Sequence, residues 1–283
     1  MKPRNIALTG AGLALLAAVA TLGHGLWQTE AEIARHAAEV AGIGAARPSP
    51  ALDPEQIADL PAPVQRYLRF AFPGPVPRAA VVRLQAEGQF RRPRTDGFNP
   101  TRAEQVIAPG TPALLFSAST SMGPGLWARA YDFYAEGQMA MKARVLSTLT
   151  VVDEHETPAL NRISLRRWLL ESALYPQALL PGGPVRWEAI DDSHARAVVT
   201  RDGMTASMVA EVDGMGRMTA MRAEDEGDLT TPYHGSGEHV TRGDYRLESG
   251  VMIPHSFTIS RAAGGQIYPF WTGRIVAIGF EAP

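Results

Sequence analysis

Arg167 and Glu171 are the charged pair in this sequence with the clearest chemical potential. They lie four positions apart in a segment that predicts a helix, and side chains at this spacing share a helix face and can form an ion pair. Trp168 lies beside them and would shield the pair from water, which shifts the pKa of a carboxylate. We therefore expect an Arg167–Glu171 ion pair that either ties the helix to the rest of the fold or contacts a ligand.

Carboxylates alone offer a second chemistry. Glu171 or Asp132 could act as the acid or base of a hydrolase, because two carboxylates across a cleft suffice to cleave a glycosidic bond. The sequence contains no Gly-x-Ser-x-Gly motif and no phosphate-binding loop, so the usual signatures of other hydrolases are absent. We assign no catalytic residue and keep the hydrolase as an alternative.

The sequence contains no recognisable set of ligands for a metal ion or a cofactor. The chain has no cysteine, and its seven histidines form no His-Glu-x-x-His motif, which excludes the commonest zinc sites. The 27 basic and 29 acidic residues give a net charge of −2, without the basic excess of proteins that bind nucleic acids. We expect no metal, no cofactor and no nucleic-acid partner.

Methionines are concentrated in one part of the chain, where five of the ten lie between Met204 and Met221. Met204 and Met208 share one face of a predicted strand, because side chains alternate between the two faces of a sheet. Methionine is flexible and polarizable, so it suits both a packed core and a compliant apolar wall. Both interpretations stay open: core filling, or a cavity for a lipid-like ligand.

The elements that must position these side chains are mostly strands. Residues 82–91 alternate between apolar and polar side chains, as a strand does when one face of its sheet meets water. Asp202-Gly203 and Asp213-Gly214 are hairpin signals between later strands. Further runs with this period follow at 103–108, 112–119, 127–135, 139–152, 195–201, 204–212, 216–224, 238–247 and 253–260.

Helices are predicted at only a few places among the strands. One runs from about residue 62 to 72, and a longer one from about 158 to 175, with Thr157 as its N-cap and Pro158 at its first position. This order of elements predicts a β-rich α+β fold. Its main part is a large, curved antiparallel sheet, a half-barrel, with a few helices packed on one side.

The first 27 residues predict a signal anchor or a signal peptide. Lys2 and Arg4 precede an uncharged run from Ile6 to Trp27, and a helix over this run is about 33 Å long, enough to cross the apolar core of a bilayer. The basic flank places the N-terminus in the cytoplasm and the rest of the chain outside. We favour an inner-membrane anchor at residues 6–27. A cleaved periplasmic form remains open, because small residues at 18–20 fit a cleavage site.

Residues 28–60 predict a helical and proline-rich linker. Its first part is rich in Ala and Glu, whereas Pro48, Pro50 and Pro54 interrupt regular structure. Residues 61–283 then form the β-rich domain.

Several short motifs of this domain recur together in other proteins. They are Pro63-Val64-x-Arg66-Tyr67-Leu68, Gly88-x-Phe90-Arg91, Ala103-x-Gln105, Asp132-x-Tyr134-x-x-Gly137, Leu169-x-Glu171, Tyr175-Pro176-x-Ala178-Leu179-Leu180 and Gly250-x-x-Ile253-Pro254. In this order they resemble the DUF6544/DUF6920 group of uncharacterised bacterial proteins. That group has no established activity, so the resemblance implies no catalytic residue. Its plan is similar to the half-barrel of lipoprotein carriers, which implies an apolar cavity between sheet and helices.

The sequence thus favours an envelope protein whose half-barrel binds a lipid or another amphiphile. The inward faces of 82–90, 141–151 and 204–212 would line the cavity. The candidate ligand-binding residues, in the cavity or at its rim, are Arg91, Arg167, Trp168, Glu171, Met204 and Met208. The alternatives are the hydrolase and a structural or interaction module with a solid core.

Overall fold

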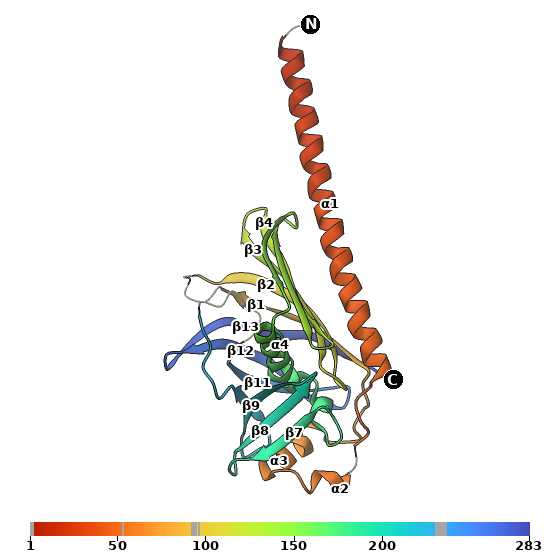
Figure 1. The fold of residues 1–283 in the computed structure, drawn as a ribbon, viewed down its shortest axis with the longest axis vertical. Helices are drawn as coiled ribbons and strands as arrows, with labels where there is room; N and C mark the ends of the chain where they lie inside the picture. Colours follow the sequence, from red (N-terminus) through yellow and green to blue (C-terminus); the bar gives the residue numbers. More distant parts are fainter. Residues whose placement is uncertain (1–2, 53, 92–94, 96, 230–236) are drawn as a thin grey trace.

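The computed structural model describes residues 3–52, 54–91, 95, 97–229 and 237–283, without the side chains of residues 3–11, 14 and 54. In this part of the chain, 13 strands form one antiparallel sheet in the order β6-β5-β4-β3-β2-β1-β13-β12-β11-β10-β9-β8-β7 (Figure 1). The strands are β1 (Val81–Phe90), β2 (Asn99–Ala108), β3 (Ala113–Gly123), β4 (Leu126–Ala135), β5 (Gln138–Val145), β6 (Leu149–His155), β7 (Val185–Ala189), β8 (His194–Arg201), β9 (Met204–Val212), β10 (Met218–Arg222), β11 (His239–Glu248), β12 (Val251–Ala263) and β13 (Gln266–Glu281). The predicted large antiparallel sheet is confirmed.

The sheet consists of two meanders that meet in its middle. Strands β1 to β6 form one meander and β7 to β13 the other, and the first strand of the chain pairs with the last. Gly88 of β1 lies directly opposite Gly273 of β13 in this pairing. We call the β1–β13 pair the seam, because it is where the two halves of the sheet are joined.

The inner face of the sheet carries helices and the main hydrophobic core. The helices α3 (Ala62–Ala71) and α4 (Pro158–Glu171) lie here, followed by the 3₁₀ turns η1 (Ser172–Leu174) and η2 (Pro176–Leu179). Tyr67 of α3, Trp168 of α4 and Val82 of β1 are fully buried in the same core. Helix α2 (Pro54–Ile57) precedes them.

The outer face carries one long helix, α1 (Pro3–Ala46), which we had not expected there. Val81 follows the alternation of β1 onto this face, where it packs in a second core with Ile33 and Val40 of α1. The two helices predicted among the strands, α3 and α4, do lie on one side of the sheet, whereas α1 covers the other side, where no helix was predicted. Residues 28–46, expected as part of a linker, are the C-terminal half of α1 and lie against the strands.

The N-terminal half of α1 extends beyond the sheet (Figure 1). In the described part of the chain, no helix has a stretch long and apolar enough to cross a membrane. Residues 1–2 and the side chains of 3–11 and 14, which belong to the predicted anchor segment, lie outside the described residues. The anchor therefore stays a prediction from sequence.

The structure differs from the sequence-based expectation at three other places. The single run at 139–152 is two strands, β5 and β6, joined by a turn in which Leu146 and Ser147 have positive φ angles. The helix expected to reach residue 175 ends at Glu171 and continues as 3₁₀ turns. Strands β7 and β13 were not expected, although β13 is the longest of the described strands.

We expect Gly88→Ala to destabilise the protein through the seam. An added Cβ would lie 2.1 Å from the carbonyl oxygen of Thr272, so the paired backbones must separate, at a cost of about 1–3 kcal/mol. Gly214→Ala is the matched control, because nothing lies within 4 Å of a Cβ there. Urea unfolding followed by circular dichroism measures both variants. Equal midpoints for Gly88→Ala and the wild type would show that the seam tolerates a side chain.

Candidate functional site

Helix α4 places three charged side chains against the inner face of the sheet. Thr157 caps the helix by accepting a hydrogen bond from the backbone N–H of Leu160, and Pro158 occupies the first turn, as the sequence predicts. The helix has apolar side chains around most of its circumference, so Arg167 and Glu171 are buried with them. Buried charges need partners, because their desolvation is otherwise uncompensated.

Arg167 finds its partner on strand β4. Its guanidinium donates to the carboxylate of Asp132, and the two side chains are only 3% and 4% exposed. The same guanidinium lies over the ring of Phe116 on β3, 4.4 Å from the ring centroid. An ion pair and an aromatic face thus hold Arg167 from two neighbouring strands.

Glu171 pairs with Arg242 of β11, on the other half of the sheet, at 2.9 Å. The expected Arg167–Glu171 pair is therefore wrong, although both side chains are buried as that expectation required. The two lie one helical turn apart, but each has a partner on a strand below the helix, at Asp132 or Arg242. A strand partner buried with the helix gives the better hydrogen bond, whereas an i,i+4 contact leaves the strand charges unpaired.

The adjacent Arg166 makes the third connection. It donates to the buried carboxylate of Glu238 at 2.8 Å, and Arg261 of β12 donates to the same carboxylate at 2.9 Å. Helix α4 is thus tied to both meanders through charged side chains.

A small cavity lies beside the Asp132–Arg167 pair. Its volume is about 90 Å³, less than the roughly 150 Å³ of an apolar cavity that accepts benzene. Its lining is mostly aromatic and apolar and comes from β1–β5, β13 and α4. The lining residues are Phe90, Thr101, Phe116, Ala118, Thr120, Ala130, Tyr131, Asp132, Met141, Arg167, Phe270 and Trp271.

The predicted site residues do not lie together. Arg167 lines the cavity, whereas Glu171 lies with Arg242 away from it. Trp168 is fully buried and donates from its indole N–H to the carbonyl of Ala108 at 3.2 Å, so it is a core residue. Burial raises the pKa of Tyr175 well above its ordinary value, which keeps its hydroxyl protonated for its bond to the carbonyl of Trp168.

The two methionines do not line this cavity. Met208 is fully buried in the main core, and Met204 packs against that core from a partly exposed position. Their strand, β9, belongs to the other meander, so the inward face of 204–212 lies away from the lining on β1–β5 and β13. The cavity uses Met141 instead.

Arg91 lies at the end of β1, next to the cavity residue Phe90. Its guanidinium donates to the carbonyl of Pro269 at 2.8 Å and lies 4.6 Å from the ring centroid of Phe98. Its backbone N–H donates to the carbonyl of Phe270, which lines the cavity. The sequence therefore placed Arg91 near the cavity, and its role as a rim residue stays a prediction.

The carboxylates named for hydrolysis are each held by a buried guanidinium, Asp132 by Arg167 and Glu171 by Arg242. In this arrangement both carboxylates serve the packing of α4 on the sheet. Among the described residues, no group of three histidine, aspartate or glutamate side chains is placed to hold a metal ion.

Among the residues of this region that sequence reasoning missed are Arg242, Phe116, Phe270 and Trp271. Phe116 was within reach, because the alternation of its strand places it on the inner face with Ala118. Phe270 and Trp271 belong to β13, in which one proline and two glycines hide the alternation of side chains. Nothing in the sequence marks Arg242 as the partner of Glu171, since 71 positions separate them.

Double-mutant cycles can test the corrected pairing. We expect Arg167→Met or Asp132→Leu alone to lower the free energy of unfolding by about 3–5 kcal/mol, because each leaves a buried charge unpaired. The double variant should lose less than the sum of the single losses. The cycle of Arg167→Met with Glu171→Gln should give the smaller coupling energy. Urea unfolding measures all variants, and a larger coupling for Arg167 with Glu171 would contradict the structure.

Two solved structures resemble the fold of this chain. One is a LolA superfamily protein, NE2245 from Nitrosomonas europaea, 8% identical, with a TM-score of 0.41 over 78% of this chain and 93% of that one. Another is a putative outer membrane lipoprotein-sorting protein domain from Vibrio parahaemolyticus, 9% identical, with a TM-score of 0.41 over 80% of this chain and 91% of that one. No curated protein matches the chain.

The family comparison covers most of the chain. The sequence model of a family of unknown function, DUF6920, matches residues 58–280. This confirms the DUF6920 part of the resemblance seen in the motifs, and the DUF6544 part is not shown. The chain therefore belongs to the DUF6920 family.

Proposed function

We propose that this protein binds an acyl chain of a lipid or of another amphiphile in the cavity beside Arg167. The observation that carries the proposal is the lining itself, in which Phe90, Phe116, Phe270 and Trp271 surround a volume of about 90 Å³. Cavities that bind small ligands combine apolar walls with a few fixed polar groups. Asp132 and Arg167 provide such groups here, and their opposite charges offset each other.

The volume limits what the cavity can hold. At about 90 Å³ it is smaller than the benzene-sized cavity mentioned above, so it accepts only the end of a chain. The remainder of the ligand must lie outside, along the inner face of the sheet. The proposed ligand is therefore long and apolar.

A fluorescent fatty acid tests this proposal with the full chain. We expect saturable binding, and we expect Ala130→Phe to weaken it by about tenfold or more, because the larger side chain fills the cavity. Ala277→Phe is the matched control, since Ala277 is exposed and lies opposite Gln85 on the outer face. Urea unfolding shows whether both variants remain folded. Absence of a saturable site in the wild type, or unchanged affinity in folded Ala130→Phe, would refute the proposal.

We also propose that residues 28–283 lie outside the cytoplasm, with an anchor at residues 6–27 in the inner membrane. The supporting observation is the order of charges, with Lys2 and Arg4 before the uncharged run and Glu30 and Glu32 after it.

A reporter enzyme that works only in the cytoplasm, fused after Pro283, should therefore be inactive in cells. The same reporter fused to a cytoplasmic protein is the control for expression. Activity of the Pro283 fusion would reverse the proposed orientation.

A further inference from the structure

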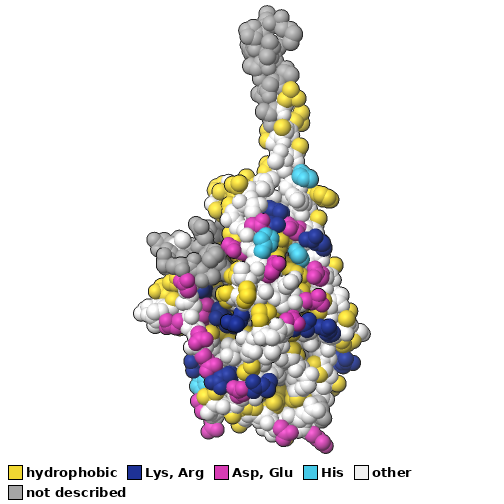
Figure 2. Space-filling model, in the orientation of Figure 1, with side chains coloured by type: hydrophobic (Ala, Val, Ile, Leu, Met, Phe, Trp, Pro, Cys, Tyr) yellow, Lys and Arg dark blue, Asp and Glu magenta, His cyan; other side chains and the backbone are white. Residues whose placement is uncertain are grey.

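One end of the molecule exposes apolar side chains from several elements. Met122 of β3 is 48% exposed, Leu149 of β6 is 65% exposed, and Leu126 and Val151 are exposed as well. Helix α1 extends past this end, which we call the apolar end (Figure 1). Figure 2 shows hydrophobic side chains along the protruding helix and where it leaves the domain, with charged side chains below.

Helix α1 touches the apolar end directly. A Cβ added at Gly25 would meet the side chain of Thr148, in the turn between β5 and β6. One helical turn further, the hydroxyl of Thr29 lies 3.1 Å from the carbonyl of Ser147. The turn between β5 and β6 is therefore beside the helix, at the level where its uncharged part begins.

Two tryptophans lie near this level. The indole N–H of Trp127 on β4 donates to the hydroxyl of Ser147 at 3.4 Å. Trp27 of α1 lies two residues before Thr29 and is 68% exposed. Tryptophan is enriched where a protein crosses from the apolar core of a bilayer to water.

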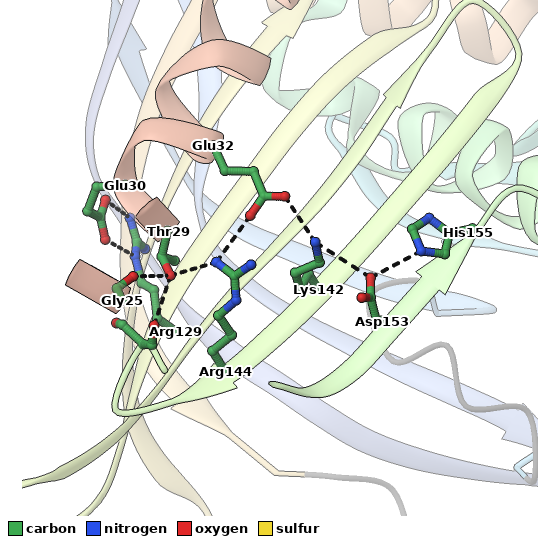
Figure 3. A network of polar contacts seen from close by, with 10 residues as sticks. Gly25, Thr29, Glu30, Glu32, Arg129, Lys142, Arg144, Asp153 and His155 are labelled. Atoms are coloured by element: carbon green, nitrogen blue, oxygen red, sulfur yellow. Dashed lines mark hydrogen bonds and ion pairs between the residues drawn. The ribbon is translucent and has the colours of Figure 1, made fainter. Parts of the chain in front are cut away.

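On the C-terminal side of Trp27, ion pairs hold α1 against the outer face (Figure 3). Arg129 donates two hydrogen bonds to Glu30, at 2.8 and 3.0 Å. Lys142 and Arg144 lie 3.0 and 3.1 Å from Glu32. Burial raises the pKa of Glu32, but the hydrogen bond and charge of Lys142 outweigh it, so this pKa lies below its ordinary value. The helix therefore leaves the domain in a fixed direction. Its two glutamates nearest the uncharged part, Glu30 and Glu32, are both neutralised by basic side chains of the sheet.

On the inner face, the same end is connected to the cavity. Phe116, Ala118 and Thr120 of β3 line the cavity, and Met122 follows them at the end of the strand, where the pairing of β3 with β4 is irregular. On β4, Asp132 and Ala130 line the cavity, and the side chains of the inner face continue from them toward the turn between β3 and β4. We define the apolar track as the apolar residues between cavity and turns: Ala128 on β4 and Ala143 and Val145 on β5, which share the inner face with Ala130, and Met122 and Leu126 at the turn between β3 and β4.

We propose that the apolar end rests on the surface of a lipid bilayer, and that the apolar track leads a lipid acyl chain from the bilayer to the cavity. The second part rests on the proposed function. A bilayer is the one occupant that covers both the protruding apolar helix and the exposed turns around it, since residues 6–28 carry no charge. The small size of the cavity fits this arrangement, because the rest of the chain lies along the track.

The absence of cysteine allows a site-specific test with the full chain. Met122→Cys is labelled with an environment-sensitive fluorophore, and the chain is reconstituted into vesicles of phosphatidylcholine and phosphatidylglycerol. We expect a blue-shifted emission that brominated lipids quench. Met215→Cys is the matched control, an exposed methionine in the turn between β9 and β10, next to Gly216, which lies against Arg66 of α3. Its label should emit as in water.

Two results would overturn the docking. One is a water-like, unquenched label at position 122. The other is a blue shift of that label that persists when the chain is held in an amphipathic polymer (an amphipol) without vesicles. That result would show that a second copy or another protein segment covers the apolar end.

A transfer measurement separates docking from ligand binding. A fluorescent fatty acid is supplied either from solution or from the vesicles that hold the protein, and energy transfer from tryptophan reports its arrival. Met122→Glu with Leu126→Glu should slow transfer from vesicles by about tenfold and also weaken binding of probe from solution, because the bound chain lies along the track. Ala277→Phe on the outer face should change neither. Unchanged transfer would refute the track. Absence of binding from both sources would refute the proposed function, whereas the label at position 122 would still decide the docking.

Discussion

The placement of helix α4 depends on buried ion pairs to the sheet. Arg167 must meet Asp132, Glu171 must meet Arg242, and Arg166 must meet Glu238. Burying such charges yields little net stability, but breaking one pair costs several kcal/mol. Apolar contacts would tolerate a small shift of α4, whereas the three pairs are satisfied together in only one position. That position leaves the inner face of β3–β5 open beyond Asp132, and the cavity and the apolar track follow from this gap.

The seam gives the cavity its other wall. Phe90 ends β1, and Trp271 lies opposite it on β13, so both side chains reach the cavity only because the first and last strands of the domain pair. These strands are 181 positions apart where Phe90 meets Trp271 (271 − 90). Loop-closure entropy must be overcome before such a pairing forms. The cavity is therefore a product of the complete sheet and belongs to neither meander alone.

Sequence reasoning succeeded where a signal is local. Alternation identified most strands, and Thr157 with Pro158 marked the start of α4. It failed where the deciding contact is remote or the local signal is weak. The turn at Leu146 and Ser147 has positive φ angles without a glycine, so neither glycine nor proline marks the boundary between β5 and β6 in the sequence. Arg242 lies too far along the chain from Glu171 to suggest a pair, and the period of β13 is interrupted by proline and glycine.

Strand alternation also explains how one hairpin can serve both faces of the sheet. On β4, Arg129 points outward to Glu30 of α1, while its neighbours Ala128 and Ala130 lie on the inner face. On β5, Lys142 likewise points outward to Glu32 of α1, while Ala143 lies on the inner face opposite Ala130. A shift of one residue in the register of β4 would turn the alanines outward and the arginine inward, because side chains alternate with a period of two. The contacts that fix the direction of α1 and those that form the track are therefore set by the same register.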